Sequence, residues 1–230
     1  MHDIQKILLK RLLQQNGQKY STLTVGYNFE DNIVFHLKQL ISRKLVEKNN
    51  GNYLITAEGA KTITQYDLTT IKDLGFKTFF IGFLCCSENQ YLIKEHSTEH
   101  SNFYNLPSGK PRFGEPIDDV LVRTFEENTG IILKPSDFEY KSLHLKTVKT
   151  SSGEVLFDDA FAIYQVNVDL KQKDSMKLHK QISWKSVTDI ESLSDRWPEL
   201  DLLILKRDKT AYRTYEFISD YVLANDQLFK

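Results

Sequence analysis

Several features that would narrow the function at once are scarce or absent in this sequence of 230 residues. It has no apolar run approaching the roughly 20 residues that cross a bilayer. Its first residues mix charged and apolar side chains, so we expect a soluble, cytoplasmic protein without membrane contact. It also has no glycine-rich phosphate-binding loop of the P-loop kind. Its hydrophobic content of 40% nevertheless supplies more than one core, which excludes disorder of the whole chain.

Cysteine is almost absent. The only two, Cys85 and Cys86, are neighbours within the apolar run FFIGFLCC. Adjacent strand residues point to opposite faces, so a disulfide between them would be strained. We therefore interpret them as reduced, buried thiols, as in a cytosolic protein.

A strong net charge is missing as well, because the chain carries −1 at pH 7. The charge is unevenly distributed, however. Residues 1–66 hold nine Lys or Arg against five Asp or Glu, a balance of +4, which leaves −5 for the remainder. This asymmetry indicates two modules with different partners.

Residues 1–66 have the pattern of three helices and a β-hairpin. Apolar residues at helical spacing begin at Ile4 and stop at Asn16-Gly17, residues 20–25 suit a short second helix, and a third carries Ile33, Leu37, Leu40 and Ile41 on one face. Residues 49–52, Asn-Asn-Gly-Asn, separate two short strands as hairpin turns do. This order predicts a winged helix-turn-helix domain.

The segments HLKQLISRKLVEK and YLITAEG resemble winged-helix regulators over residues 1–66. The resemblance implies that the third helix reads duplex DNA while basic side chains contact phosphate. The candidate DNA-binding residues are Asn32, His36, Lys38 and Gln39 for base edges and Arg43, Lys44 and Lys48 for phosphates. The alternative is a module that only dimerises the protein or packs on its neighbour.

Residues 67–75 form the predicted connector, and the polar stretch 62–73 suits either a helix or an ordered linker. The pattern from residue 76 favours strands, with a hairpin around residues 87–89 and further strands at 141–148, 155–168 and near 182–184. Helical spacing recurs in the tail at Leu200, Leu203 and Ile204 and again at Tyr215, Ile218 and Val222, which predicts a C-terminal helix. Residues 76–230 are therefore expected to be α+β, a mixed sheet covered by helices.

The stretch LPSGKPRFGEPIDDVLVRTFEENTGI, residues 106–131, predicts a loop followed by a helix. Pro116 suits the first turn of a helix and Gly130 its C-terminal stop, so we expect the helix over about 116–129. Successive helical residues are 100° apart, which places Thr124, Glu127 and Asn128 on one face.

This stretch resembles the Nudix box, G-x5-E-x7-R-E-U-x-E-E-x-G-U, where U is a bulky aliphatic residue. Gly109, Glu115, Arg123, Glu127, Gly130 and Ile131 match in register. The resemblance implies a mixed β-sheet in an α/β/α sandwich over residues 76–230 and a nucleoside-diphosphate-type ligand. It assigns structural roles in the box to Gly109, Glu115, Arg123 and Gly130, with Arg123 paired to Glu115.

Two departures from the box bear on chemistry. The family's three helix glutamates, which hold divalent cations, correspond here to Thr124, Glu127 and Asn128, so one carboxylate remains. We expect these three residues to bind magnesium weakly, because magnesium is commonly held by carboxylates and neither Thr124 nor Asn128 brings a negative charge. Glu127 is the candidate catalytic residue, and the alternative is a merely solvated Glu127. Other bases left open are Glu115, Glu154, Asp158 and Asp159, whereas Glu126 lies 200° around the helix from Thr124.

Aromatic residues flank the box. Phe103, Tyr104 and Phe113 are candidates for stacking a base or ribose, and packing in the sheet is the alternative. Residues 96–100 fit H-x-x-E-H, a zinc-protease pattern that requires a helix. We expect a loop and interpret the match as coincidence, with His96 or His100 near a ligand as an open alternative.

These observations predict a ligand-responsive transcription regulator. In this reading, binding of a nucleotide derivative alters the fit of a homodimer's winged helices to DNA half-sites, with weak or absent hydrolysis. The Nudix family includes regulators that sense nucleotide sugars such as ADP-ribose, with the DNA-binding module C-terminal. The alternatives are an active magnesium-dependent pyrophosphohydrolase with a substituted base, and a binding protein whose winged helix contacts only protein.

Overall fold

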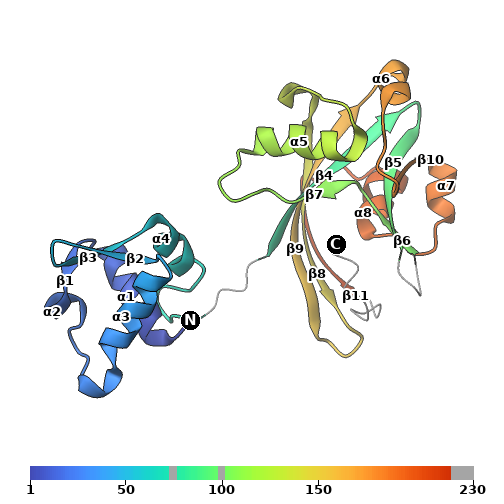
Figure 1. The fold of residues 1–230 in the computed structure, drawn as a ribbon. Helices are drawn as coiled ribbons and strands as arrows, with labels where there is room; N and C mark the ends of the chain where they lie inside the picture. Colours follow the sequence, from blue (N-terminus) through green and yellow to red (C-terminus); the bar gives the residue numbers. More distant parts are fainter. Residues whose placement is uncertain (73–76, 98–101, 219–230) are drawn as a thin grey trace. The chain divides into compact units, whose positions relative to one another are not determined.

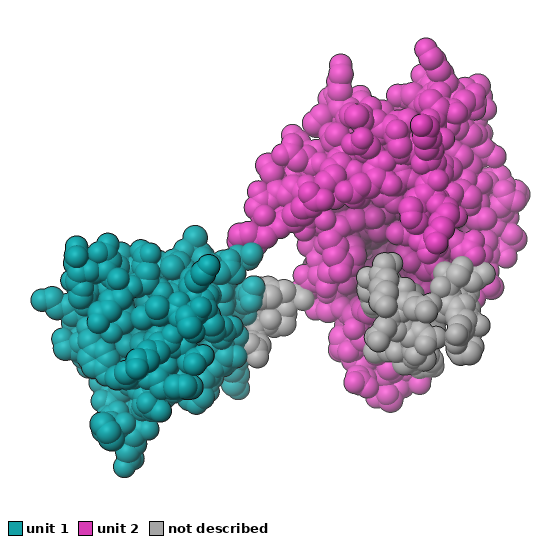
Figure 2. All heavy atoms as spheres, in the orientation of Figure 1, with its two compact units in different colours: residues 1–76 teal, residues 77–230 magenta. Residues whose placement is uncertain are grey.

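A computed structural model describes residues 1–72, 77–97 and 102–218. The chain divides into two compact units, Met1–Phe76 and Lys77–Lys230 (Figure 2). Within the described ranges, none of the helices combines the length and the apolar character that a membrane span needs.

The described residues of the first unit form α-helices and a small sheet (Figure 1). Its elements in chain order are α1 (Asp3–Gln14), β1 (Gln18–Lys19), α2 (Tyr20–Leu23), the 3-10 turn η1 (Phe29–Asp31), α3 (Ile33–Ser42), β2 (Val46–Asn49), β3 (Asn52–Ile55) and α4 (Ala57–Ile63). The antiparallel sheet has the order β1-β3-β2. The predicted order of three helices and a hairpin is confirmed.

The core of this unit forms where the apolar stripe of α1 meets α3. Leu8, Leu9 and Leu12 are fully buried and belong to one cluster with Leu37 and Leu40. Ile41, which the spacing predicted on the same face, is instead 37% exposed. The Ile41 side chain is rotated by 100° around the helix from that of Leu40, so it points away from the face that packs against α1.

The hairpin turn follows from residues that tolerate a left-handed backbone. Asn50 and Gly51 lie at φ 49° and 81°, as a two-residue turn between twisted strands requires. The next element, α4, begins at Ala57 after the side chain of Thr56 caps the backbone N–H of Gly59. It ends at Ile63, so it covers only the start of the polar stretch 62–73.

The second unit is built on a mixed sheet (Figure 1). Its elements are β4 (Thr78–Ser87), β5 (Gln90–Ser97), β6 (Asn102–Asn105), β7 (Ser108–Gly109), α5 (Ile117–Thr129), the 3-10 turn η2 (Pro135–Asp137), β8 (Glu139–Lys149), β9 (Val155–Asn167), α6 (Leu170–Ser175), β10 (Ile182–Ser186), α7 (Val187–Ser192), α8 (Pro198–Leu200), the π-helical turn η3 (Asp201–Leu205) and β11 (Tyr212–Ile218).

Helices cover this sheet on both faces. The strand order is β10-β5-β4-β9-β8-β11, with β6 paired to β5 and β7 to β4, and the β4–β9 and β8–β11 pairs are parallel. One core joins the strands to α5 through Val120, Leu121 and Phe125. A second joins the opposite face to α7, α8 and η3 (Figure 1). The expectation of an α+β unit with a mixed sheet between helices is confirmed.

The tail is only partly helical. Leu200, Leu203 and Ile204 are buried in α8 and η3, as the spacing predicts. Tyr215 and Ile218, however, lie on β11, which runs parallel to β8, so the helix predicted there is wrong. Exposure alternates along β11, with Tyr215 turned inward and Ile218 66% exposed, which is the period of a strand. Val222 lies outside the described residues.

Candidate functional site

The box segment folds as a loop lying against a helix. Pro116 precedes α5, and Gly130 ends it with φ 73°, as a left-handed C-terminal stop requires. Gly109 on β7 packs so closely that an added Cβ would lie 2.4 Å from Cγ2 of Thr124. A side chain at position 109 would therefore push the loop away from the helix.

An ion pair braces this loop. Arg123 on α5 donates from Nε to Glu115 Oε1 at 2.6 Å and from Nη2 to Glu115 Oε2 at 2.7 Å. Nη2 also donates to the carbonyl of Lys110 at 3.3 Å. The hydrogen bonds from Arg123, with that from the Arg112 N–H, lower the pKa of Glu115 to about 2. This is the bracing role that the resemblance implies for the pair.

Thr124, Glu127 and Asn128 do not converge on one open face. Thr124 and Asn128 are buried at 1% and 8% exposure, and the Asn128 amide donates to the Thr124 carbonyl at 2.7 Å. The Glu127 carboxylate is about half exposed and accepts from Arg123 at 3.1 Å. Helical spacing placed the three residues within a 100° arc, but the sheet covers one side of that arc. This donor set does not fit magnesium, which prefers charged oxygens that point into a shared site.

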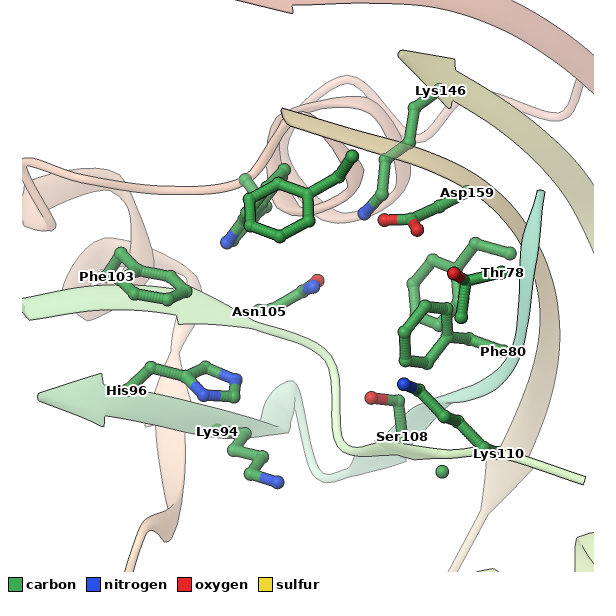
Figure 3. Close-up of a pocket in the computed structure, with 14 residues that line it drawn as sticks. Thr78, Phe80, Lys94, His96, Phe103, Asn105, Ser108, Lys110, Lys146 and Asp159 are labelled. Atoms are coloured by element: carbon green, nitrogen blue, oxygen red, sulfur yellow. The ribbon is translucent and has the colours of Figure 1, made fainter. Parts of the chain in front are cut away.

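A cavity of the second unit lies on the sheet, next to the start of the box loop (Figure 3). Its volume is about 410 Å³. The residues that line it are Thr78, Phe80, Lys94, His96, Phe103, Asn105, Ser108, Gly109, Lys110, Lys146, Phe157, Asp159, Phe161 and Trp197. Aromatic rings and lysines dominate, a combination that suits a flat, anionic ligand.

Rings and charged groups are interspersed around the cavity (Figure 3). The rings of His96 and Phe103 stack at one end, with centroids 4.8 Å apart and planes 9° apart. Lys110, Lys146 and Asp159 lie toward the other end. Lys94 lies on the side of the stacked rings, and the Phe80 ring lies 5.0 Å from the Lys110 ammonium, so the ligand would meet rings and charged groups together.

Lys146 is held in place at the wall of the cavity by two contacts. Its ammonium lies 2.7 Å from Glu199 Oε1 and 4.3 Å from the centroid of the Trp197 ring. Glu199 is fully buried. Burial opposes ionisation of Glu199, but the Lys146 ammonium outweighs that cost and keeps the pKa of the carboxyl below its ordinary value. The pair fixes a cation at the wall of the cavity.

Three further groups in the cavity have shifted pKa values. Burial lowers the pKa of Lys94. Burial, together with the charges of Lys94 and Lys146, lowers the pKa of His96 to about 4. Burial raises the pKa of Asp159, although Lys146 opposes the shift. His96 is therefore neutral at pH 7. Shifted groups gathered in one cavity are typical of a functional site.

The three aromatic candidates differ in whether they line the cavity. Phe103 is 5% exposed and lines the cavity. Tyr104 does not line it, and its ring lies 5.7 Å from the Lys185 ammonium. Phe113 is 82% exposed and also does not line it. Phe103 alone of the three is placed to stack against a ligand in this cavity.

The other proposed bases also separate. Glu154 is exposed, and Asp158 pairs with Lys77 and accepts from Thr147 at 3.0 Å. Asp159 lines the cavity. His96 lies on β5 rather than in the predicted loop and lines the cavity too, whereas His100 is outside the described residues.

The sequence interpretation missed most of the cavity because its lining comes from several strands that only the sheet brings together. One of these strands, β8, carries Lys146 and inverts the usual hydrophobic pattern. Ser142, His144 and Lys146 are buried, while the alternating Leu143 and Leu145 are only half-buried. A row of polar side chains at period 2 was the available signal. One sequence, however, cannot tell a polar interior from a solvated face.

The candidate DNA-contact residues of the first unit are mostly exposed. Lys38 and Gln39 lie on α3, Arg43 and Lys44 follow it, Lys48 lies on β2, and Asn32 precedes α3. His36, however, is 8% exposed, and its ring stacks on that of His2 with centroids 4.5 Å apart. The expectation that His36 is exposed is wrong, because α1 begins beside it.

No family model matches the chain, and no curated protein matches it. Among solved structures, it is similar to the mutator MutT protein from Bacillus halodurans, with 16% identity, 64% of this chain and 95% of that chain covered, and a TM-score of 0.49. It is also similar to the NUDIX domain of Shewanella oneidensis NrtR complexed with ADP ribose, with 12% identity, 66% and 97% covered, and a TM-score of 0.47. A third similar structure is a NUDIX hydrolase from Nitrosomonas europaea, with 11% identity, 76% of this chain and 93% of that chain covered, and a TM-score of 0.43.

Proposed function

We propose that this chain is a transcription regulator in which a Nudix-type second unit binds a nucleotide derivative and a winged-helix first unit binds duplex DNA as a homodimer. The ligand belongs to the nucleoside-diphosphate class. Hydrolysis is weak or absent, and magnesium binds weakly. Ligand binding shifts the population of arrangements that fit DNA half-sites.

The cavity of the second unit carries the ligand part of this proposal. Stacked His96 and Phe103 rings suit a base or ribose, and the Lys94 and Lys110 ammonium groups suit phosphate oxygens. A volume of about 410 Å³ lies within the range of small-molecule sites. The cavity thus offers rings for the base or ribose of a nucleotide and cations for its phosphates.

The expectation of little hydrolysis rests on α5. Its one box carboxylate, Glu127, is paired with Arg123, and Thr124 and Asn128 are buried. A threonine hydroxyl cannot serve as a general base at neutral pH, and a well-placed base contributes about 10²–10⁴-fold to a rate.

Turnover of ADP-ribose with magnesium tests this assignment. We expect a rate at least about 100-fold below that of a Nudix enzyme with all three carboxylates. Glu127→Gln should leave that residual rate unchanged, and exposed Glu126→Gln is the matched control. A robust rate that Glu127→Gln abolishes would contradict the proposal.

One observation favours a second candidate, a hydrolase with a substituted base. Asp159 is a buried carboxylate with a raised pKa inside the cavity, as a general base would be. If this candidate holds, a robust rate will survive Glu127→Gln and be lost in Asp159→Asn.

The first unit also has an alternative partner. Val34 and Phe35 on α3 are 52% and 49% exposed, next to the polar candidates. Apolar side chains on this helix favour contact with protein, although thymine methyl groups are also apolar. DNA binding at low salt distinguishes the two.

A further inference from the structure

Asp159 is the one carboxylate among the residues that line the cavity, and within the described ranges it has no internal partner. Its side chain is 9% exposed, and its carboxylate points into the cavity beside Lys146 (Figure 3). Across the described ranges, no hydrogen bond or ion pair joins this carboxylate to another residue. Its oxygens are not among the buried polar atoms that lack a partner, so they are accessible from the cavity and can accept hydrogen bonds from a ligand there.

Lys146 does not supply the missing partner. Its ammonium is already paired with Glu199 at 2.7 Å, and that pair is neutral as a whole. Lys94 and Lys110 also line the cavity, and neither is paired with a carboxylate in the part of the chain that the structure describes. The cavity therefore holds cations for an anionic group and, separately, a carboxylate that can accept hydrogen bonds from the same ligand.

An anion alone cannot satisfy both requirements. Its oxygens would suit Lys94 and Lys110 but would repel Asp159. A compound that carries an anionic group together with hydroxyl or amino groups satisfies both, because its O–H or N–H groups donate to the carboxylate. Hydrogen bonds to a charged acceptor discriminate strongly against compounds that lack the donor.

We propose that Asp159 is a specificity-determining residue that accepts hydrogen bonds from hydroxyl or amino groups of the ligand. The cavity then takes phosphorylated sugar or nucleoside compounds and disfavours bare phosphate anions. This inference rests on the proposed function. It adds that the cavity recognises hydroxyl or amino groups of the ligand as well as its charge.

The adjacent Asp158 provides a matched control. It points away from Asp159 on the same strand, is about 40% exposed in its side chain, and pairs with Lys77. Asp158→Asn and Asp159→Asn make the same chemical change one residue apart, on opposite faces of β9.

Calorimetric titration of the full chain without divalent metal tests the inference, with ADP-ribose and inorganic pyrophosphate as probes. Pyrophosphate has the anionic groups but neither sugar hydroxyl nor amine. We expect Asp159→Asn to weaken ADP-ribose about tenfold or more and to leave pyrophosphate binding unchanged or tighter, since a repelling charge is gone. Asp158→Asn should change both affinities less than about twofold.

The outcomes separate the inference from the proposed function. If the natural chain binds ADP-ribose and Asp159→Asn weakens both probes alike, or neither, the inference is overturned while ligand binding stands. If the natural chain binds neither probe, the proposed function fails and the inference fails with it.

Discussion

Glu115 shows how neighbouring residues set the behaviour of one carboxylate. Its hydrogen bonds from Arg123 lower its pKa from 4.5 to about 2 in the folded protein. Because the folded pKa lies below the unfolded one, the stabilisation is fully present above about pH 4.5 and is lost as the pH falls toward 2. Asp159 on β9 behaves in the opposite way, since burial without a partner raises its pKa.

At this scale we predict the effect of Glu115→Gln. The variant should have a lower melting temperature at pH 7 and a shallower loss of stability between pH 4.5 and pH 2, because the ion pair with Arg123 is gone. Thermal unfolding at a series of pH values measures both effects. Glu126→Gln, an exposed change on the same helix, should follow the natural protein. Identical curves for Glu115→Gln and the natural protein would show that the pair does not brace the loop.

At the scale of elements, local signals predicted more than long-range ones could. The bounds of α5 follow from Pro116 and Gly130, which act within one turn of the backbone. Tyr215 and Ile218 had helical spacing but became part of β11, because pairing with β8 is a contact about 70 residues away in sequence. The cavity itself was largely missed for the same reason, since its lining comes from strands that only the sheet brings together.

The packing of β7 on α5 gives a prediction at this scale. Gly109→Ala should lower the melting temperature and weaken ligand binding, because the new Cβ meets Thr124 Cγ2 at 2.4 Å. Thr124→Ala removes that methyl group and should restore part of both losses in the double variant. A double-mutant cycle, in which calorimetry compares the natural protein, the two single variants and the double variant, measures the coupling between positions 109 and 124. Simple additivity of the two changes would contradict the proposed contact.

For the whole molecule, the central question is whether the two units bind different partners. We predict salt-sensitive binding of the chain to duplex DNA from its own upstream region. Lys44→Ala and Lys48→Ala should each weaken it and reduce the slope of log affinity against log salt by about 1. Lys209→Ala, an exposed lysine of the second unit, is the charge-matched control. Failure to bind at low salt would favour the protein-contact role of α3.

Trp197 offers the most direct test of the ligand site, because it lines the cavity and Trp184 is the only other tryptophan. In a Trp184→Phe variant, the remaining indole fluorescence reports on the cavity alone. ADP-ribose titrated without magnesium should change that fluorescence in a saturable way, and excess ligand should be recovered unhydrolysed. Unchanged fluorescence throughout the titration, with the variant folded, would contradict a nucleotide-binding cavity in the second unit.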